Sequence, residues 1–292
     1  MSENVNKALE IDTLINSKYL IKRVISIGNI GITYLVEYQK LLYIVKEFFP
    51  VDVYIRDIDK KNIVRRYPTK NRKKEDVFKR NFISEGTILK ILDLECVPKY
   101  IEEFNENGTN YIVMEYIEGI DLKEWSRQNK TETKKKFEIL EKIAMSLEEI
   151  HEKGIIHRDI KPSNILIDNK NRVYLIDFGS SICKEKEEEK EIFISEGYSA
   201  IEMYSKLSNQ DERVDIYSLG GVIYSVFTEK QPVDSSKRII EDQMKEIVNS
   251  NSNLSYITKK LILKMMEMKM QKRVKRMKII RRVINIQKNL TF

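Results

Sequence analysis

The sequence of 292 residues has little cysteine, glycine, proline and tryptophan, and it has no long hydrophobic run. Its two cysteines, Cys96 and Cys183, form no Cys-x-x-Cys pair, so the sequence predicts no cysteine metal site and favours a reducing, cytoplasmic setting. The most apolar segment, residues 216–228, contains two serines and is shorter than the roughly 20 apolar residues of a membrane-spanning helix. Residues 1–14 lack the apolar run of a signal peptide. We therefore expect no transmembrane segment.

The composition is typical of a folded protein with a basic surface: 41% of residues are hydrophobic, 33% are charged, and the net charge is +7 at pH 7. A chain of this length can bury a core as one large domain or as two lobes. Positive charge can indicate nucleic acid, anionic lipid or acidic protein partners, but it also occurs on surfaces with no such partner. We favour the latter interpretation and expect no nucleic-acid partner.

The first third of the chain is rich in β-branched and aromatic residues separated by glycine or polar turns, which predicts strands. The expected strands are residues 19–26, 32–37, 42–48, 100–104 and 111–115. The polar and basic segment 50–74 is expected to be a long loop, of the kind that is usually functional or mobile. Apolar residues at helical spacing predict a helix over residues 75–92.

The remainder of the chain is mostly helical in pattern. An amphipathic helix is expected over residues 131–153, with Gly154 as its stop, and short strands over 165–167 and 173–176. A chain that is β-rich early and α-rich late predicts an α+β fold in two lobes, with a boundary near Glu118.

The most informative segment is His-Arg-Asp-Ile-Lys-Pro-Ser-Asn at residues 157–164, followed by Asp-Phe-Gly beginning at Asp177. Asp159 could accept a proton from an attacking hydroxyl, and Lys161 could neutralise a phosphoryl oxygen. Asn164 and Asp177 offer the oxygen ligands that Mg²⁺ prefers. Because both motifs occur in the order and spacing of protein kinases, the pair is a far stronger signal than Asp-Phe-Gly alone.

Two further features are individually weak. Ser26, Gly28 and Gly31 lie in a turn between two expected strands, where small residues let backbone amides approach phosphates. Lys46, on the next strand, could hold the α- and β-phosphates of a nucleotide in an interlobe cleft. The alternatives are an ordinary turn for the first feature and an exposed strand lysine for Lys46. The His-Arg-Asp and Asp-Phe-Gly motifs decide against both alternatives.

Glu85 is the expected partner of Lys46 because it lies in the middle of the helix predicted over residues 75–92. Glu75 and Glu95 are the competing carboxylates, and the alternative role for Glu85 itself is a solvated helix residue.

These residues together resemble the eukaryotic-type Ser/Thr protein kinases, and Gly-Ile-Thr-Tyr and Ile-Val-Lys-Glu-Phe-Phe-Pro resemble bacterial members. The resemblance covers about residues 19–287. It implies a five-stranded antiparallel sheet with one helix in an N-lobe, residues 19–118, and a mainly helical C-lobe, residues 119–292, with ATP bound between them. Residues 1–18 would be an N-terminal extension.

The resemblance also assigns roles to single residues. The implied catalytic residues are Asp159 as base, Lys161, Lys46 and Glu85. The implied nucleotide-binding residues are Ser26, Gly28 and Gly31 of the glycine-rich loop, Lys46, the gatekeeper Met114, and Glu115 and Ile117 of the hinge. The implied metal ligands are Asn164 and Asp177, holding Mg²⁺, with Mn²⁺ as the alternative.

In the C-lobe the resemblance places Ser195 in the substrate-proximal loop, pairs Glu202 with Arg273, and makes Asp215 the brace of the catalytic loop.

The sequence departs from the family at three positions. Ser26 replaces the first glycine of the glycine-rich loop, Asn29 stands where bacterial members often have another glycine, and Ile201 replaces the proline of Ala-Pro-Glu. None of the three is needed for phosphoryl transfer.

Three charged runs have competing interpretations. A glutamate among Glu187–Glu189 could supply an anion to Arg158, but a solvated run is favoured. The basic residues of 269–288 could bind a membrane or an acidic partner, but a final helix with Val274, Met277, Ile280 and Ile284 packed inward is favoured. The basic residues of 56–74 could likewise dock an acidic substrate or regulator, but a solvated loop is favoured.

The expected function is an ATP- and Mg²⁺-dependent Ser/Thr protein kinase with protein substrates, and autophosphorylation is left open. A small-molecule kinase of the same fold and a nucleotide-binding scaffold are the alternatives. Lys161 and the segment 195–202 favour a protein substrate, and Lys46, Asp159, Asn164 and Asp177 argue against a scaffold. The sequence does not indicate the substrate, the activating signal or the oligomeric state.

Overall fold

The computed structural model describes residues 7–57, 59–67, 72–184 and 192–290. The chain forms two compact units. The first unit comprises Met1–Asp93 and Pro98–Tyr116, and the second comprises Leu94–Val97 and Ile117–Phe292.

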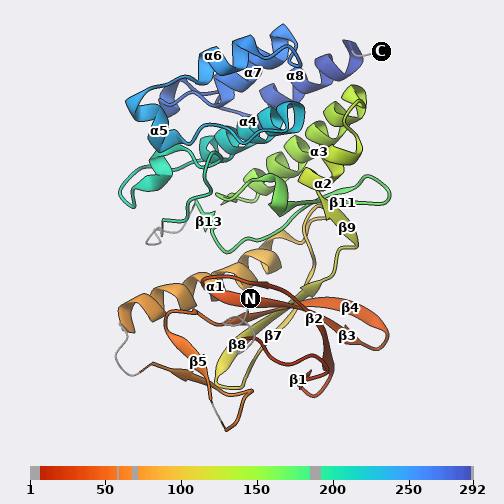
Figure 1. Cartoon of the computed structure of the whole chain (residues 1–292), viewed down its shortest axis with the longest axis vertical. Helices are drawn as coiled ribbons and strands as arrows, with labels where there is room; N and C mark the ends of the chain where they lie inside the picture. Colours follow the sequence, from red (N-terminus) through yellow and green to blue (C-terminus); the bar gives the residue numbers. More distant parts are fainter. Residues whose placement is uncertain (1–6, 58, 68–71, 185–191, 291–292) are drawn as a thin grey trace. The chain divides into compact units, whose positions relative to one another are not determined.

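The first unit contains an antiparallel sheet with the strand order β1-β2-β3-β4-β8-β7 (Figure 1). Its strands are β1 (Leu14–Ile15), β2 (Tyr19–Ile27), β3 (Gly31–Tyr38), β4 (Leu41–Phe48), β7 (Tyr100–Glu106) and β8 (Thr109–Glu115). The five expected strands are confirmed, and the two-residue β1 adds a sixth at the edge. In β3 the side chains of Ile32, Tyr34 and Val36 are buried while their neighbours are partly exposed, which is the alternation of a strand with one face on the core.

One long helix, α1 (Arg72–Leu92), accompanies this sheet (Figure 1). Its buried face includes Phe82, Glu85, Ile88 and Leu89, and the Phe82 ring lies 5.4 Å from that of Phe48 on β4. The helical spacing of these residues therefore positions Glu85 on the face that packs against the sheet.

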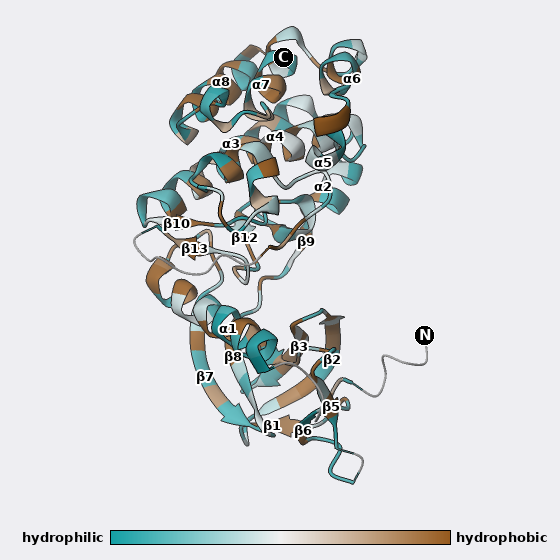
Figure 2. Ribbon diagram, turned by 90° about the vertical axis from the view of Figure 1, so that its left-hand side faces the viewer, coloured by the Kyte–Doolittle hydropathy of each residue, from teal (hydrophilic) through white to brown (hydrophobic). Residues whose placement is uncertain are grey.

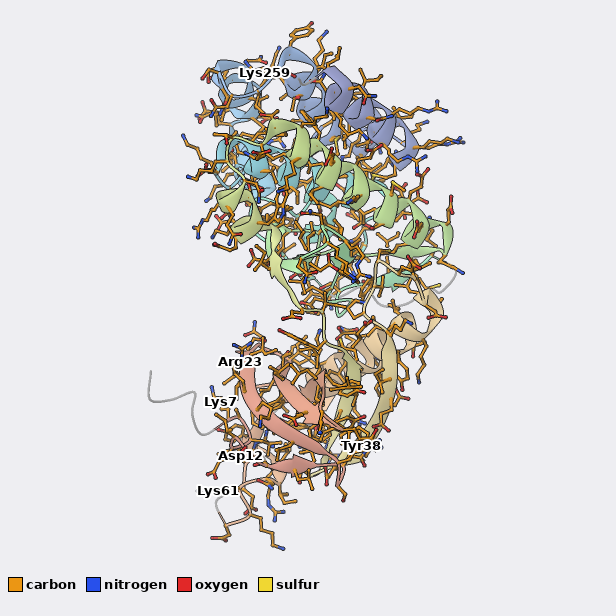
Figure 3. All side chains as sticks on the ribbon, turned by 90° about the vertical axis from the view of Figure 1, so that its right-hand side faces the viewer. Lys7, Asp12, Arg23, Tyr38, Lys61 and Lys259 are labelled. Atoms are coloured by element: carbon orange, nitrogen blue, oxygen red, sulfur yellow. The ribbon has the colours of Figure 1, made fainter. Side chains whose placement is uncertain are left out.

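The expectation of a long loop over residues 50–74 is wrong for much of that segment. Strands β5 (Tyr54–Arg56) and β6 (Val64–Arg66) pair antiparallel as a hairpin, and α1 begins at Arg72. Each strand has only three residues, which is too short for an alternating pattern to stand out among the surrounding charges. Lys61, labelled in Figure 3, lies in the connection between the two strands. Its ammonium pairs with Glu10 at 3.1 Å.

The second unit is mainly helical and carries two small sheets. Its helices are α2 (Leu122–Gln128), α3 (Thr133–Glu152), α4 (Arg213–Thr228), α5 (Ser235–Ile240), α6 (Met244–Ser250), α7 (Tyr256–Met265) and α8 (Met277–Leu290). Strands β9 (Gly119–Asp121), β11 (Ile165–Asp168) and β12 (Val173–Leu175) form one sheet, and β10 (Ile155–Ile156) and β13 (Ile182–Cys183) form the other. Short 3₁₀ helices are η1 (Pro162–Asn164), η2 (Ile201–Tyr204) and η3 (Met270–Lys272).

Helix α4 is the centre of the second unit and is buried along most of its length. A Cβ at Gly220 would lie 2.9 Å from the Cβ of Met265 and 2.8 Å from the Cγ of Met266, so glycine permits close packing at the end of α7. The apolar segment predicted to be too short for a membrane helix is therefore a core helix. None of the helices within the described ranges is long and apolar enough to cross a membrane.

The basic C-terminal segment forms an amphipathic helix on the second unit. Helices α3 and α8 both carry hydrophobic and hydrophilic bands (Figure 2). Met277, Ile280 and Ile284 of α8 are buried as expected, whereas Val274 precedes the helix and is only half-buried. Arg281 and Lys288 pair with Glu148 and Glu141 of α3 at 2.8 and 2.5 Å.

Candidate active site

In the first unit, strand β4 brings Lys46 to the buried face of α1. The Lys46 Nζ lies 2.5 Å from the Glu85 Oε1, and the two side chains are 17% and 5% exposed. Glu75, a competing carboxylate, instead contacts Tyr54 and Arg66. An ammonium that is mostly removed from water and fixed by one carboxylate has a defined direction, which is what orienting a polyphosphate requires.

The predicted glycine-rich loop is a tight turn between β2 and β3. The Gly28 N–H donates to the Gly31 carbonyl at 2.8 Å, and Ser26 is paired with Thr33 in the β2–β3 ladder. A Cβ at Gly31 would lie 2.6 Å from the Glu47 carbonyl oxygen of β4, whereas a Cβ at Gly28 would meet only an ordinary contact at 3.5 Å. Gly31 is therefore required by packing on β4, apart from any role with phosphate.

The predicted adenine-binding residues lie at the end of β8 and just beyond it. Met114 is buried and sits opposite Ile44 in the β4–β8 ladder. The Glu115 N–H donates to the Lys99 carbonyl at 2.9 Å. Ile117 is buried at the start of the main segment of the second unit.

In the second unit, the Asp159 carboxylate is held by three side chains, two from η1 and the residue before it and one from the segment before η2. The Asn164 amide nitrogen donates to its Oδ2 at 2.8 Å, the Lys161 ammonium contacts the same oxygen at 2.9 Å, and the Ser195 hydroxyl donates to Oδ1 at 2.6 Å. Lys161 also donates to the Ser195 hydroxyl at 2.9 Å. The 3₁₀ helix η1 turns the chain so that Asn164 reaches back to Asp159.

Ser195 was expected in the substrate-proximal loop, but its bond to Asp159 was not predicted. The two residues are 36 positions apart, and no local spacing could indicate the contact. The structure therefore brings a serine hydroxyl, a carboxylate and a lysine into mutual hydrogen-bond distance.

Asp215, the expected brace, binds the backbone that carries this site. Its carboxylate accepts hydrogen bonds from the N–H groups of His157 and Arg158 at 2.9 and 2.8 Å, and it lies 2.8 Å from the Nε2 of His151. Burial alone would raise the pKa of the Asp215 carboxyl, but the hydrogen bond and charge of His151 and the contacts with His157 lower it overall. Arg158 has a left-handed φ of 67°, a conformation that costs energy for a residue other than glycine and that Asp215 stabilises directly.

His157 is held in one tautomer by its neighbours. The Asp159 N–H donates to Nδ1 at 3.3 Å, so Nε2 carries the proton and donates to the Ile176 carbonyl at 3.2 Å. Burial lowers the pKa of His157, which agrees with a neutral ring, and the ring packs on Phe178 at 4.6 Å.

The predicted metal ligands approach each other through the backbone. The N–H of Ile176, the residue before Asp177, donates to the Asn164 carbonyl at 3.0 Å. No group of three or more His, Cys, Asp or Glu that could hold a metal ion occurs in the part of the chain that the structure describes.

The segment from Ser195 to Glu202 is anchored at its end by the expected ion pair and near its start by a further hydrogen bond. Arg273 pairs with Glu202 at 2.6 Å and donates to the Arg213 carbonyl at 2.7 Å, with its side chain fully buried. The Ser199 hydroxyl accepts from the Ser195 N–H at 2.9 Å. The acidic residues Glu187–Glu189 lie outside the described residues, and the Arg158 guanidinium donates to the Ser180 carbonyl at 3.1 Å.

The protein kinase domain family matches residues 30–283. The chain therefore belongs to the protein kinase domain family. The solved structure "PpkA-294 apo form" covers 95% of this chain, and the chain covers 99% of it, with a TM-score of 0.79. At 23% identity this likeness shows the fold alone, which is the two-lobed protein kinase fold.

The relatives in sequence are serine/threonine kinases. The chain is 32% identical over 199 residues to "Probable serine/threonine-protein kinase CPE1738" of Clostridium perfringens, a match that covers 64% of this chain and 29% of that protein. It is 31% identical over 173 residues to "Serine/threonine-protein kinase PrkC" of Bacillus subtilis, covering 56% and 26%. The chain thus spans less than a third of the length of these relatives. The chain is therefore a protein kinase domain, and these two relatives are named as serine/threonine kinases.

Proposed function

We propose that this chain transfers the γ-phosphoryl group of ATP to serine or threonine hydroxyls of protein substrates, with Asp159 as the catalytic base. The observation that carries the proposal is the 2.6 Å hydrogen bond from the Ser195 hydroxyl to Asp159. This contact supports a role for the carboxylate in accepting a proton from a serine hydroxyl. Lys161, 2.9 Å from both groups, places a positive charge where a transferred phosphoryl group develops negative charge.

The remaining site residues have positioning roles in this proposal. Lys46, fixed by Glu85, orients the α- and β-phosphates. The backbone of the turn containing Ser26, Gly28 and Gly31 covers the phosphates. The adenine base is held by the backbone of Glu115 and Ile117, next to Met114.

Asn164 and Asp177 are the proposed ligands of a divalent cation, and we propose Mg²⁺ rather than Mn²⁺. The Asn164 nitrogen is used by Asp159, so its amide oxygen is the atom that can serve as ligand. A bound cation would neutralise phosphate oxygens of the nucleotide. Oxygen donors suit both Mg²⁺ and Mn²⁺, and Mg²⁺ is proposed because it is usually bound by one or two carboxylates together with substrate phosphates.

We further propose that the catalytic domain covers about residues 19–287, with lobes at 19–118 and 119–292 after an extension of 18 residues, and that it acts in the cytoplasm. The anchored segment between Ser195 and Glu202 supports a protein substrate, because it fixes a surface beside Asp159. Autophosphorylation is included in the proposal.

The test is transfer of label from ATP, in the presence of Mg²⁺, to serine and threonine of a generic protein substrate. Asp159→Asn or Lys46→Ala should lower turnover by at least ~10²-fold, which is about 2.7 kcal/mol on the barrier. Asp52→Asn, at an exposed carboxylate paired with Lys74, is the matched control and should be as active as the wild type. Near-normal transfer by both site variants would contradict the assignment.

A further inference from the structure

A pocket with several charged residues on its walls lies beside the proposed catalytic residues within the second unit. Its volume is about 340 Å³, and it lies between helix α2, the start of η1 and the end of α4. The charged side chains on its walls are Lys123, Arg127, Lys161, Glu229 and Lys230. None of the nucleotide or metal residues proposed above lines it.

Lys161 connects this pocket to the reacting groups. It lines the pocket and at the same time contacts Asp159 and Ser195 at 2.9 Å. Tyr198, three residues after Ser195, forms another part of the wall. An extended polypeptide advances about 3.3 Å per residue, so residues within a few positions of a hydroxyl held at Asp159 can reach the pocket.

Four cationic residues and one acidic residue line the pocket, and because Lys161 is paired with Asp159, the positive charge comes from Lys123, Arg127 and Lys230. The acidic residue, Glu229, is paired with Lys130 at 2.8 Å, and Lys130 does not line the pocket. Among the described residues, the ammonium groups of Lys123 and Lys230 have no hydrogen-bond or ion-pair partner.

Two of these cations are placed unfavourably for the free protein. Lys123 and Arg127 are separated by four positions on α2 and are both exposed, so they lie on one face of the helix. Like charges at this spacing repel each other. The nearby Glu124 compensates weakly, because it contacts Arg127 only at 3.7 Å. An anionic group entering the pocket would relieve this repulsion.

We propose that this pocket selects protein substrates that carry aspartate or glutamate side chains within a few residues of the acceptor serine or threonine. The inference rests on the proposed kinase function and adds its substrate class. Selection acts through charge: a carboxylate from the substrate enters between α2 and the end of α4, and the acceptor hydroxyl reaches Asp159.

The experiment compares three synthetic peptides that share a single central serine and differ only in their flanking residues, which are aspartate, asparagine or lysine. For the wild type, kcat/KM for the aspartate peptide should exceed that for the asparagine peptide by about tenfold, mainly through KM, and the ratio should fall at high salt. In Lys123→Glu/Arg127→Glu the preference should reverse toward the lysine peptide. The control, Lys245→Glu/Arg282→Glu, changes one exposed lysine and one exposed arginine outside the pocket and should keep the wild-type preference.

Direct binding separates this inference from the kinase assignment. Fluorescence anisotropy of the labelled aspartate and asparagine peptides requires no catalysis, and the wild type should bind the aspartate peptide more tightly. Equal binding of the two peptides by the wild type, or an aspartate preference that persists in Lys123→Glu/Arg127→Glu, would overturn the proposal. Absence of phosphorylation on all peptides, with selective binding retained, would overturn the kinase function and leave the pocket assignment standing.

Discussion

Each unit contains a carboxylate that is completely buried, and the two are stabilised in different ways. Glu47 in the first unit and Asp215 in the second both have 0% exposure. Glu47 contacts the guanidinium of Arg56 and accepts hydroxyl hydrogen bonds from Tyr34 and Tyr111, each at 2.7 Å. Asp215 instead accepts two backbone N–H groups and contacts a histidine ring.

Each of these carboxylates fixes the backbone beside a residue of the proposed active site. Glu47 follows Lys46 on β4 and points to the opposite face of the strand. Its partner Arg56 comes from the β5–β6 hairpin and also donates to the Lys7 carbonyl at 2.8 Å, which ties the N-terminal segment to the sheet. Asp215 holds the N–H of Arg158, next to Asp159. Glu47 is stabilised mainly by the charge of the Arg56 side chain, whereas Asp215 is stabilised mainly by the dipoles of two backbone N–H groups.

The largest expected effect comes from breaking the charge pair. Arg56→Met should lower the free energy of unfolding by about 3–5 kcal/mol, because it leaves Glu47 buried without its cation. Burial raises the pKa of Tyr34 and of Tyr111, so their hydroxyls stay protonated and can offer Glu47 only neutral hydrogen bonds. Denaturant unfolding followed by circular dichroism gives the measurement.

Two variants sharpen this first prediction. Arg65→Met, on an arginine whose side chain is 64% exposed and contacts Asp57, should cost at most about 1 kcal/mol. Glu47→Gln combined with Arg56→Met should recover part of the loss, since no unpaired charge is left. A loss for Arg56→Met as small as that for Arg65→Met would mean that the buried pair contributes little.

A smaller effect on stability is expected from Asp215→Asn. The amide retains one oxygen but turns an NH₂ group toward a donor, so one buried N–H loses its acceptor at a cost of about 1–3 kcal/mol. Because the lost acceptor serves His157 or Arg158, catalysis should fall as well, while nucleotide binding through Lys46 is retained. Asp93→Asn, at an exposed aspartate, is the control. Unaltered turnover in a folded Asp215→Asn protein would contradict the bracing role.

The contrast between the two carboxylates also explains what the sequence could predict. Asp215 was expected because it lies in a recognisable local pattern, and the ion pair of Glu202 and Arg273 followed from the same resemblance. The Glu47 cluster was not expected, because Tyr111 is 64 positions away and Arg56 lies in a segment whose charges predicted a loop. Arg56, counted among the basic residues of a candidate docking loop, is buried and paired.

Contacts between residues far apart in the sequence were likewise not predicted for the candidate site. The long helices and five of the strands follow from hydrophobic periodicity, which is a local property. The contact of Ser195 with Asp159 and the pocket that combines α2 with the end of α4 depend on chain crossings that periodicity does not encode. The sequence therefore predicts which residues carry the chemistry better than it predicts what surrounds them.

The smallest expected effect concerns pH and tests the neutral histidine beside Asp215. Because burial lowers the pKa of His157 in the folded state, the unfolded chain binds more protons just below the ordinary histidine value of 6.5. Stability should therefore be complete above that pH and decline as the pH falls through it, even though Asp215, Asp159 and Asp177 favour the charged ring. The pKa of Asp215 is itself lowered, so the contribution of Asp215 to stability is lost only below the ordinary aspartate value of 3.8, in a separate pH window.

The variant His157→Gln tests this expectation, because glutamine offers a donor and an acceptor without titrating. Its unfolding free energy should depend less on pH between about 7.5 and 5.5 than that of the wild type, with His151 present in both proteins. Parallel pH profiles for the two proteins would mean that His157 carries no proton-linked stability.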